Sequence, residues 1–160
     1  MKTRFALFVV CLLSLTSCKK DESPTQSNNS NNTNCNFTTN VVVVGGVSSN
    51  VVHTNNNGLG SGYIVEFLTD TSAAPTGVAL VFGGGTSPAA GDYTVQADVS
   101  QLTTGQVYVE YYDPATAWHG TTGTVKVTAS GSQRVATFCN MELTATPTNK
   151  KTVSIRGTFN

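Results

Sequence analysis

The sequence predicts an all-β fold, namely a single antiparallel β-sandwich of about eight or nine strands over residues 35–160, with a closed antiparallel barrel as the alternative. Three observations predict this fold. Short segments in which apolar and polar residues alternate recur along the chain, as in strands with one buried face. Clusters of Gly, Asn, Ser and Pro separate these segments at roughly 10–15-residue intervals, which favours short turns between antiparallel neighbours. No segment of about ten residues shows the apolar period of an amphipathic helix.

The first 17 residues have the organisation of an export signal that precedes this domain. Lys2 and Arg4 provide a positive start, and residues 5–15 are apolar apart from Ser14. An apolar run of about 11 residues is too short to cross a bilayer, which needs about 20. Its length and flanks match a cleaved signal peptide, which we therefore expect over residues 1–17.

The apolar run ends in the residues Leu15-Thr16-Ser17-Cys18, which resemble a bacterial lipobox. In proteins with this motif the cysteine thiol carries diacylglycerol, the chain is cut before the cysteine, and the new amine receives a fatty acid such as palmitate. The resemblance implies that Cys18 is the first mature residue and anchors the protein to a membrane. Two or more acyl chains make such an anchor durable. The alternative is an ordinary secretory signal followed by an unrelated cysteine.

The polar residues after Cys18 predict a tether. Residues 19–34 (KKDESPTQSNNSNNTN) cannot bury enough apolar surface to fold, so residues 18–34 are expected to be a lipidated, disordered linker with a reach of about 20–24 Å. The charged residues Lys19 to Glu22 resemble the tag of surface-exposed lipoproteins of Bacteroidota. The resemblance implies the outer membrane and display on the cell surface, with the periplasmic face as the alternative.

The first half of the domain is predicted to contain three or four strands. Residues 40–52 are rich in valine but interrupted by Gly45-Gly46, which predicts two short strands or one bulged strand. Residues 55–62 are rich in Asn and Gly and predict a turn. Residues 62–69 alternate between apolar and polar side chains. Residues 77–82 are apolar at nearly every position, which predicts a strand buried on both faces.

The middle of the domain is predicted to contribute two regular strands. A glycine-rich loop over residues 83–90 leads to residues 92–98, which alternate with Ala97 among the inward side chains. Residues 106–112 alternate in the same way, so that every second residue faces the core. Residues 115–117 are the one short stretch that suggests a helical turn.

The last three strands are predicted at residues 123–129, 134–143 and 152–159. The first and the last alternate regularly. In the second, the apolar positions change phase near Cys139, which predicts either a bulge there or burial on both faces.

Three short segments of the C-terminal third resemble a recurring pattern of small Bacteroidota lipoproteins whose domain has no assigned function. They are residues 123–128 (GTVKVT), 134–138 (RVATF) and 153–159 (VSIRGTF). Ala136 stands where that pattern usually has a glycine. The resemblance implies a β architecture and offers no catalytic residue.

The cysteines predict one disulfide. Cys11 leaves with the signal peptide and Cys18 takes the lipid, so Cys35 and Cys139 remain as a pair in an oxidising compartment. The alternative is two separate thiols, with Cys139 buried as a small apolar side chain. Two cysteines and two distant histidines have no metal-ligand spacing, so no metal site is expected.

Composition argues against several functions. Nine basic and nine acidic residues leave no basic patch, so nucleic acid is not an expected partner. Residues 83–85 (GGG) lack the lysine and helix of a phosphate-binding loop, and no cofactor is expected. The chain has no nucleophile-elbow motif, so we expect no enzymatic activity. The alternative is a small hydrolase that uses the carboxylates of Glu110 and Asp113.

Four residues are the candidate ligand-binding group: Tyr108, Tyr112, Trp118 and His119. Both tyrosines should lie on the outer face of one strand, and exposed aromatic rings can stack on sugars while Glu110 supplies hydrogen bonds. The alternative is that Trp118 folds over an open end of the sandwich and the tyrosines pair across strands.

The sequence therefore predicts a lipid-anchored, non-enzymatic protein of the cell envelope with a binding or structural role. One alternative is a surface glycan-binding module that uses the exposed aromatic residues. A second is an accessory subunit of an envelope protein complex, which pairs through edge strands expected at residues 41–44 or 153–159.

Overall fold

The computed structural model describes residues 35–160, so the predicted signal peptide, Cys18 and the tether over residues 18–34 lie outside the described residues. Within the described range the prediction of a single all-β domain is confirmed. Its elements are β1 (Val41–Val44), β2 (Val47–Asn50), β3 (His53–Leu59), β4 (Gly62–Leu68), β5 (Gly77–Gly83), β6 (Gly91–Val95), the short 3-10 helix η1 (Val99–Gln101), β7 (Gln106–Asp113), β8 (Thr116–Gly120), β9 (Thr124–Ser130), β10 (Gln133–Thr146) and β11 (Asn149–Phe159).

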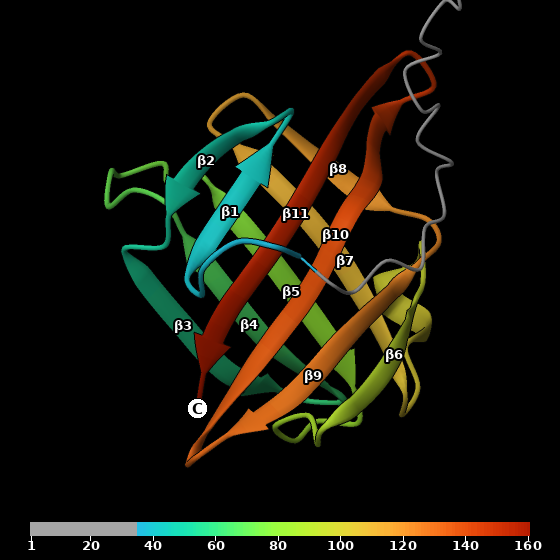
Figure 1. The fold of residues 1–160 in the computed structure, drawn as a ribbon. Coiled ribbons are helices and arrows are strands. Elements are labelled where there is room, and N and C mark those ends of the chain that lie inside the picture. Colours follow the sequence, from blue (N-terminus) through green and yellow to red (C-terminus); the bar gives the residue numbers. More distant parts are fainter. Residues whose placement is uncertain (1–34) are drawn as a thin grey trace, which may run out of the picture.

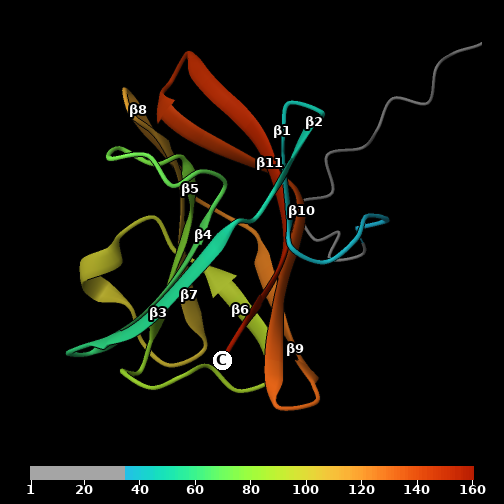
Figure 2. The same cartoon turned by 90° about the vertical axis from the view of Figure 1, so that its left-hand side faces the viewer.

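All strands belong to one curled sheet. Ten of them follow the order β2-β1-β11-β10-β9-β6-β7-β5-β4-β3 (Figure 1), and β8 lies off this path. The sheet closes partly into a ring with two facing layers: β1, β9, β10 and β11 form one layer, and β3, β4, β5 and β7 the other (Figure 2). Two strands join the layers, because β6 pairs with β9 and β7 while β8 pairs with β10 and β7. The architecture thus combines the predicted sandwich with the barrel alternative.

One strand pair departs from the predicted antiparallel arrangement. β6 and β7 run parallel, with Val95 opposite Val107. Parallel neighbours need a connection that returns the chain to the same end of the sheet. Residues 96–105, which contain η1, provide this connection and are longer than the turns that join the other strands.

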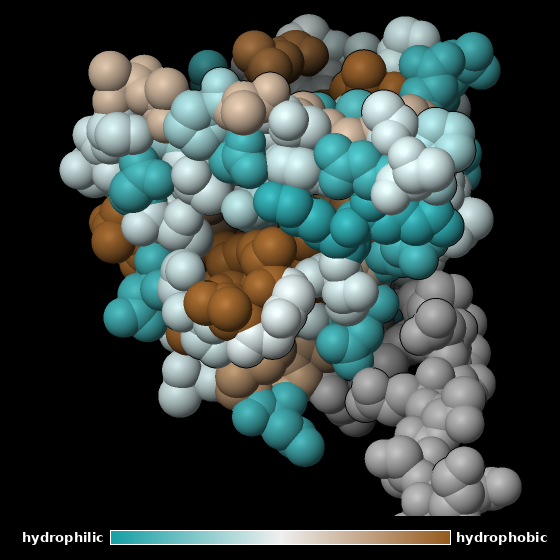
Figure 3. Space-filling view, turned by 90° about the horizontal axis from the view of Figure 1, so that it is seen from above, coloured by the Kyte–Doolittle hydropathy of each residue, from teal (hydrophilic) through white to brown (hydrophobic). Residues whose placement is uncertain are grey.

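The core lies between the two layers. The alternation predicted for β7, β9 and β11 is confirmed, because their alternate apolar residues are buried: Val107, Val109, Tyr111, Val125, Val127, Val153, Ile155 and Phe159. Phe82 contacts Tyr93 at a centroid distance of 4.9 Å, edge to face. β5 is apolar and buried on both faces, as predicted. Seen from the end that carries the β10–β11 hairpin, hydrophobic surface gathers in a hollow bordered by hydrophilic residues (Figure 3).

β10 contains the bulge predicted near Cys139. Its pairing with β11 shifts register between Phe138 and Met141, where three steps along β10 match two along β11. Asn140, inside the bulge, has a φ of 53°, in the left-handed region that Asn tolerates better than most residues. The extra residue restores the inward phase, so Phe138 and Met141 are both buried.

Two segments predicted to be turns are largely strand. Residues 55–62 contribute to β3, which pairs with β4 over seven residues and leaves Gly60 and Ser61 for the turn. Residues 115–117 run into β8, which pairs with β7. Both segments have weak strand propensity, so backbone pairing with a regular neighbour decides their conformation.

The strand predicted at residues 92–98 is shorter than expected. β6 ends at Val95, and Ala97 is exposed instead of facing the core. The Asp98 carboxylate accepts a hydrogen bond from the Ser100 backbone N–H at 2.9 Å, which caps η1 and favours a turn over an extended backbone.

Residues 40–52 form two short strands, as predicted, but the expected edge strands are wrong. β1 lies between β2 and β11, and β11 lies between β1 and β10, so residues 41–44 and 153–159 are interior. The edges of the sheet are β2 and β3. The Gly45-Gly46 turn is responsible, because it folds β2 back along the outer side of β1.

Candidate functional site

The candidate site is the outward surface of β4, β5, β7 and β8, called here the tyrosine face. Because Val107, Val109 and Tyr111 of β7 point into the core, the residues between them point outward. The tyrosine face is defined by Glu66, Tyr108, Glu110, Tyr112 and His119.

Three side chains at one end of this face form a connected group. Glu110 lies directly opposite His119 in the β7–β8 pair. The Tyr108 hydroxyl donates to Glu110 Oε2 at 3.0 Å and lies 3.0 Å from His119 Nδ1. The tyrosine and histidine rings are stacked, with centroids 5.9 Å apart. Burial, together with the Glu110 carboxylate, raises the pKa of Tyr108, so its hydroxyl remains a neutral donor.

Tyr112 lies across the neighbouring strand at the other end of the face. It pairs with Gly77 of β5, and a Cβ at Gly77 would lie 3.2 Å from the Tyr112 hydroxyl. The hydroxyl contacts Glu66 Oε1 on β4 at 3.5 Å, and Asn55 Nδ2 donates to Glu66 Oε2 at 3.2 Å. Burial, followed by the charge of Glu66, raises the pKa of Tyr112 to about 12. The aromatic ring therefore covers the glycine and is held in place at its hydroxyl end.

At the centre of the face, a small residue lies between two carboxylates. Ala79 of β5 lies opposite both Glu66 and Glu110, and it is 7% exposed because the longer side chains around it cover it. Two strand spacings place the backbones of the two glutamates about 10 Å apart. The face thus offers aromatic surface, two hydrogen-bond acceptors and a small residue between them.

Trp118 does not belong to this face, contrary to the prediction. It is 4% exposed and lies opposite Tyr111 on the inward side of β8, with ring centroids 5.5 Å apart. Its Nε1 donates to Asn149 Oδ1 at 3.0 Å, under the β10–β11 hairpin. The structure shows the alternative placement, in which Trp118 packs at one end of the sandwich. Alternation along β8 explains the error, because His119 and Trp118 must point to opposite sides.

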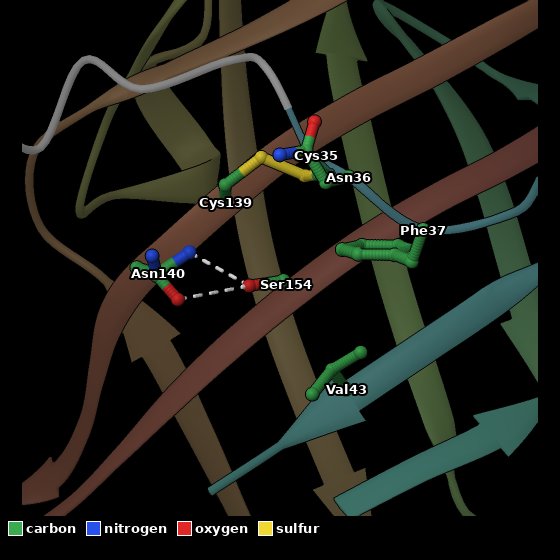
Figure 4. Close-up of a pocket in the computed structure, with 7 residues that line it drawn as sticks. All are labelled: Cys35, Asn36, Phe37, Val43, Cys139, Asn140 and Ser154. Atoms are coloured by element: carbon green, nitrogen blue, oxygen red, sulfur yellow. Dashed lines mark hydrogen bonds between the residues drawn. A yellow bond between two sulfur atoms is a disulfide. The ribbon is translucent and has the colours of Figure 1, made fainter. Parts of the chain in front are cut away.

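Cys35 and Cys139 form the predicted disulfide, with Cα atoms 5.6 Å apart. The disulfide borders an open pocket on the outer side of β10, β11 and β1. The volume of this pocket, about 280 Å³, is close to the smallest volume typical of ligand pockets. Asn140 and Ser154 line one side of this pocket and Phe37 and Val43 another (Figure 4). The Asn140 N–H donates to Ser154 Oγ at 2.7 Å, and the Ser154 hydroxyl lies 3.5 Å from Asn140 Oδ1, so these two residues of the pocket are paired with each other.

The carboxylates considered for hydrolysis do not form a pair. Glu110 lies on the tyrosine face. Asp113 is an odd number of residues beyond Glu110 on β7, so its side chain points to the other side of the sheet, where it contacts Lys151. Within residues 35–160, no group of three or more His, Cys, Asp or Glu side chains is placed to hold a metal ion. The same residues include no helix of the length and hydropathy that crossing a bilayer requires.

Sequence reasoning missed Glu66 and Asn55. The alternation of residues 62–69 places Glu66 on the outer side, but no local pattern shows that β4 lies two strands from β7. No protein-family model, curated protein or solved structure matches the chain, so the function is inferred from these residues alone.

Proposed function

We propose that this chain is a lipid-anchored protein of the bacterial outer membrane, displayed on the cell surface, whose β domain is a non-enzymatic module that binds a ligand through the tyrosine face. The observation that carries the binding role is the Tyr112 ring, which lies across Gly77 with its hydroxyl directed to Glu66. The anchor is supported by Leu15-Thr16-Ser17-Cys18 after an apolar run. Export is supported by the Cys35–Cys139 disulfide, since structural disulfides persist in oxidising compartments.

The chemistry of the tyrosine face favours a hydroxyl-rich ligand such as a glycan. A flat aromatic ring offers apolar surface for the C–H face of a sugar, and its fixed orientation lowers the entropic cost of binding. The Glu66 and Glu110 carboxylates can accept hydrogen bonds from sugar hydroxyls, and charge-assisted bonds are the stronger kind. Because the residues that define the face include two acidic residues, Glu66 and Glu110, and no lysine or arginine, the face favours neutral over anionic glycans.

Glycan-array binding by the purified full chain, followed by calorimetry with the best ligand, tests the proposal. Tyr112→Ala should lower affinity by about tenfold, and Tyr112→Phe, which keeps the ring, should retain most of it. Lys126→Ala is the matched control, because Lys126 is exposed on β9 in the other layer. Equal binding by wild type, Tyr112→Ala and Glu66→Gln would exclude this face as the ligand site.

The lipid anchor has a separate test. Wild type should partition into the detergent phase with a mass increase on the N-terminal fragment, and Cys18→Ser should remain in the aqueous phase. Protease treatment of intact cells should remove the domain if it is displayed on the surface and should spare it on the periplasmic face. Equal partitioning of the two proteins would refute the lipobox interpretation.

The edge strand β2 favours a second candidate function, an accessory subunit that pairs with an envelope protein by strand addition. All four residues of β2 are exposed, and Val47 is 71% exposed. Unpaired edge strands recruit partner strands, and a lysine on the edge opposes this. Val47→Lys should abolish a cross-link to a specific partner in membranes, while Val99→Lys, on the exposed η1, should not.

A further inference from the structure

A second group of aromatic and charged residues lies at the end of the sandwich, beneath the β10–β11 hairpin. Figure 2 shows this hairpin leaning across the end of the domain toward β8, and β10 pairs with β8 at Leu143 and Gly120. Beneath the hairpin lie Tyr111 and Asp113 of β7 and Trp118 of β8, called here the ammonium cage. The hairpin contributes Lys151, whose ammonium group occupies the cage.

The contacts of Lys151 are those of a bound cation. Its Nζ lies 3.7 Å from the centroid of the Trp118 ring and 4.9 Å from that of Tyr111. Asp113 Oδ2 is 3.4 Å from the same nitrogen. Two aromatic walls and one carboxylate are the elements by which proteins recognise quaternary and methylated ammonium groups.

The walls of the cage are held by contacts that do not involve Lys151. Asp113 Oδ1 accepts hydrogen bonds from the backbone N–H groups of Ala115 and Thr116, both at 3.0 Å. The first of these bonds is the largest cause of the lowered pKa of Asp113, which keeps the carboxylate ionised. Trp118 Nε1 donates to Asn149, which fixes the indole. A cage preorganised in this way keeps its shape when the lysine leaves.

We propose that Tyr111, Asp113 and Trp118 form a binding site for a quaternary or methylated ammonium group, and that Lys151 occupies this site in the unliganded protein. A lysine ammonium is compact and strongly hydrated, so it regains favourable hydration when it moves into water. The side chain of Lys151 is already 29% exposed, and the cage is therefore open toward solvent. A methylated ammonium is weakly hydrated and gains more from the aromatic walls.

Competition with Lys151 sets the expected affinity difference. A ligand that binds the lysine-free state has its apparent affinity reduced by the fraction of protein in that state. The cation–π contact of Lys151 is partly desolvated and its ion pair with Asp113 is partly exposed. Together they should favour the state with Lys151 in the cage over the state with Lys151 in solvent by about ten to one. Removal of the Lys151 side chain should therefore tighten ligand binding by about tenfold.

Trp118 is the only tryptophan in the chain, so its fluorescence reports directly on the cage. The purified full chain is titrated with choline chloride at constant ionic strength, and in parallel with 3,3-dimethyl-1-butanol, the uncharged carbon analogue of choline. Choline should change the fluorescence of wild type, and of Lys151→Ala at about tenfold lower concentration. The uncharged analogue should produce no saturable change in either protein.

Three further variants complete the experiment. Lys150→Ala is the matched control, because Lys150 lies on the same hairpin but pairs with Glu142 at 2.7 Å, and it should bind choline like wild type. Asp113→Asn keeps the Oδ1 acceptor for the turn and removes the charge, so in the Lys151→Ala background it should weaken binding several-fold. Lys151→Gln serves as a second cage-opening variant in case Lys151→Ala does not fold. Choline binding no tighter in the folded opening variant than in wild type, or equal binding of the uncharged analogue, would overturn the proposal.

Discussion

Gly157→Ala tests how the two layers pack, because this glycine makes room for a core aromatic ring. Gly157 lies on β11, opposite Ala136 of β10. A Cβ at Gly157 would meet three atoms of the Phe67 ring, the farthest at 2.9 Å, closer than real Cβ atoms come. The φ of Gly157 lies outside the left-handed region, so alanine brings a steric conflict without backbone strain. The substitution therefore isolates the packing of β4 against β11.

The expected cost follows from the burial of Phe67. Its side chain is fully buried and contacts Phe159 edge to face at 6.4 Å, so it cannot rotate toward solvent. Overpacking a well-filled core costs about 1–3 kcal/mol, and a ring enclosed on all sides favours the upper half of that range. Gly157→Ala should thus lower the free energy of unfolding by about 2–3 kcal/mol. For a domain of this size the Tm should fall by about 6–15 °C.

Urea and thermal unfolding followed by circular dichroism measure the effect, and a double-mutant cycle identifies its cause. Phe67→Leu removes the ring atoms that meet the new Cβ, so the double variant should lose about 1–2 kcal/mol less than the sum of the single variants. Gly91→Ala is the control, since a Cβ there meets nothing within 4 Å; its effect should lie between none and a gain of about 1 kcal/mol. Additive losses in the cycle would show that Phe67 is not the obstacle.

Three further predictions concern stability. Replacing Cys35 and Cys139 by serine opens a loop with a sequence separation of 104 and should lower the free energy of unfolding by about 2–5 kcal/mol, measured by urea unfolding against the disulfide-bonded wild type, whereas the reduced wild type should unfold like the variant. Hydrogen bonds, first from the Ser72 hydroxyl, lower the pKa of Asp70 from 3.8 to about 2. Because the pKa of Asp70 is lower in the folded than in the unfolded protein, ionised Asp70 stabilises the fold above about pH 4, and this contribution should vanish as the pH falls to about 2. The free energy of unfolding of Asp70→Asn, measured against pH, should lack that part of the pH dependence. At Asn140, where φ is 53°, glycine should be tolerated and alanine should cost about 1 kcal/mol, and equal stability of the two variants would contradict the bulge geometry.

Local patterns predict most strands of the domain but not the weak ones. β5, β7, β9 and β11 follow from alternating or continuous apolar residues, since burying them stabilises the strand directly. The bulge in β10 is visible as a change of phase at Cys139, because each extra residue reverses the side-chain direction. β3 and β8 carry no such signal and become strands because β4 and β7 offer them paired backbones.

The candidate sites divide in the same way. Strand alternation places Tyr108, Glu110 and Tyr112 on one outer face, and the structure agrees. Glu66 lies on the same face because β4 is two strands from β7 in the sheet. Trp118 does not, because side chains alternate along β8 and Trp118 points to the side opposite to His119. Lys151 is 38 residues from Asp113 in sequence, and the fold of the β10–β11 hairpin brings the two together.

The amino-acid sequence by itself determined the all-β class and the inward faces of the regular strands, because both depend on a short-range period. It favoured a bond between Cys35 and Cys139 over two separate thiols, and the structure shows the bond. The tertiary structure decided the strand order, the parallel β6–β7 pair and the composition of the tyrosine face and the ammonium cage. These features depend on which distant strands share hydrogen bonds and on how a large side chain such as Phe67 fits against a glycine in the opposite layer. Backbone hydrogen bonds carry no side-chain identity, so shape and burial across the whole domain choose among the pairings that the local patterns allow.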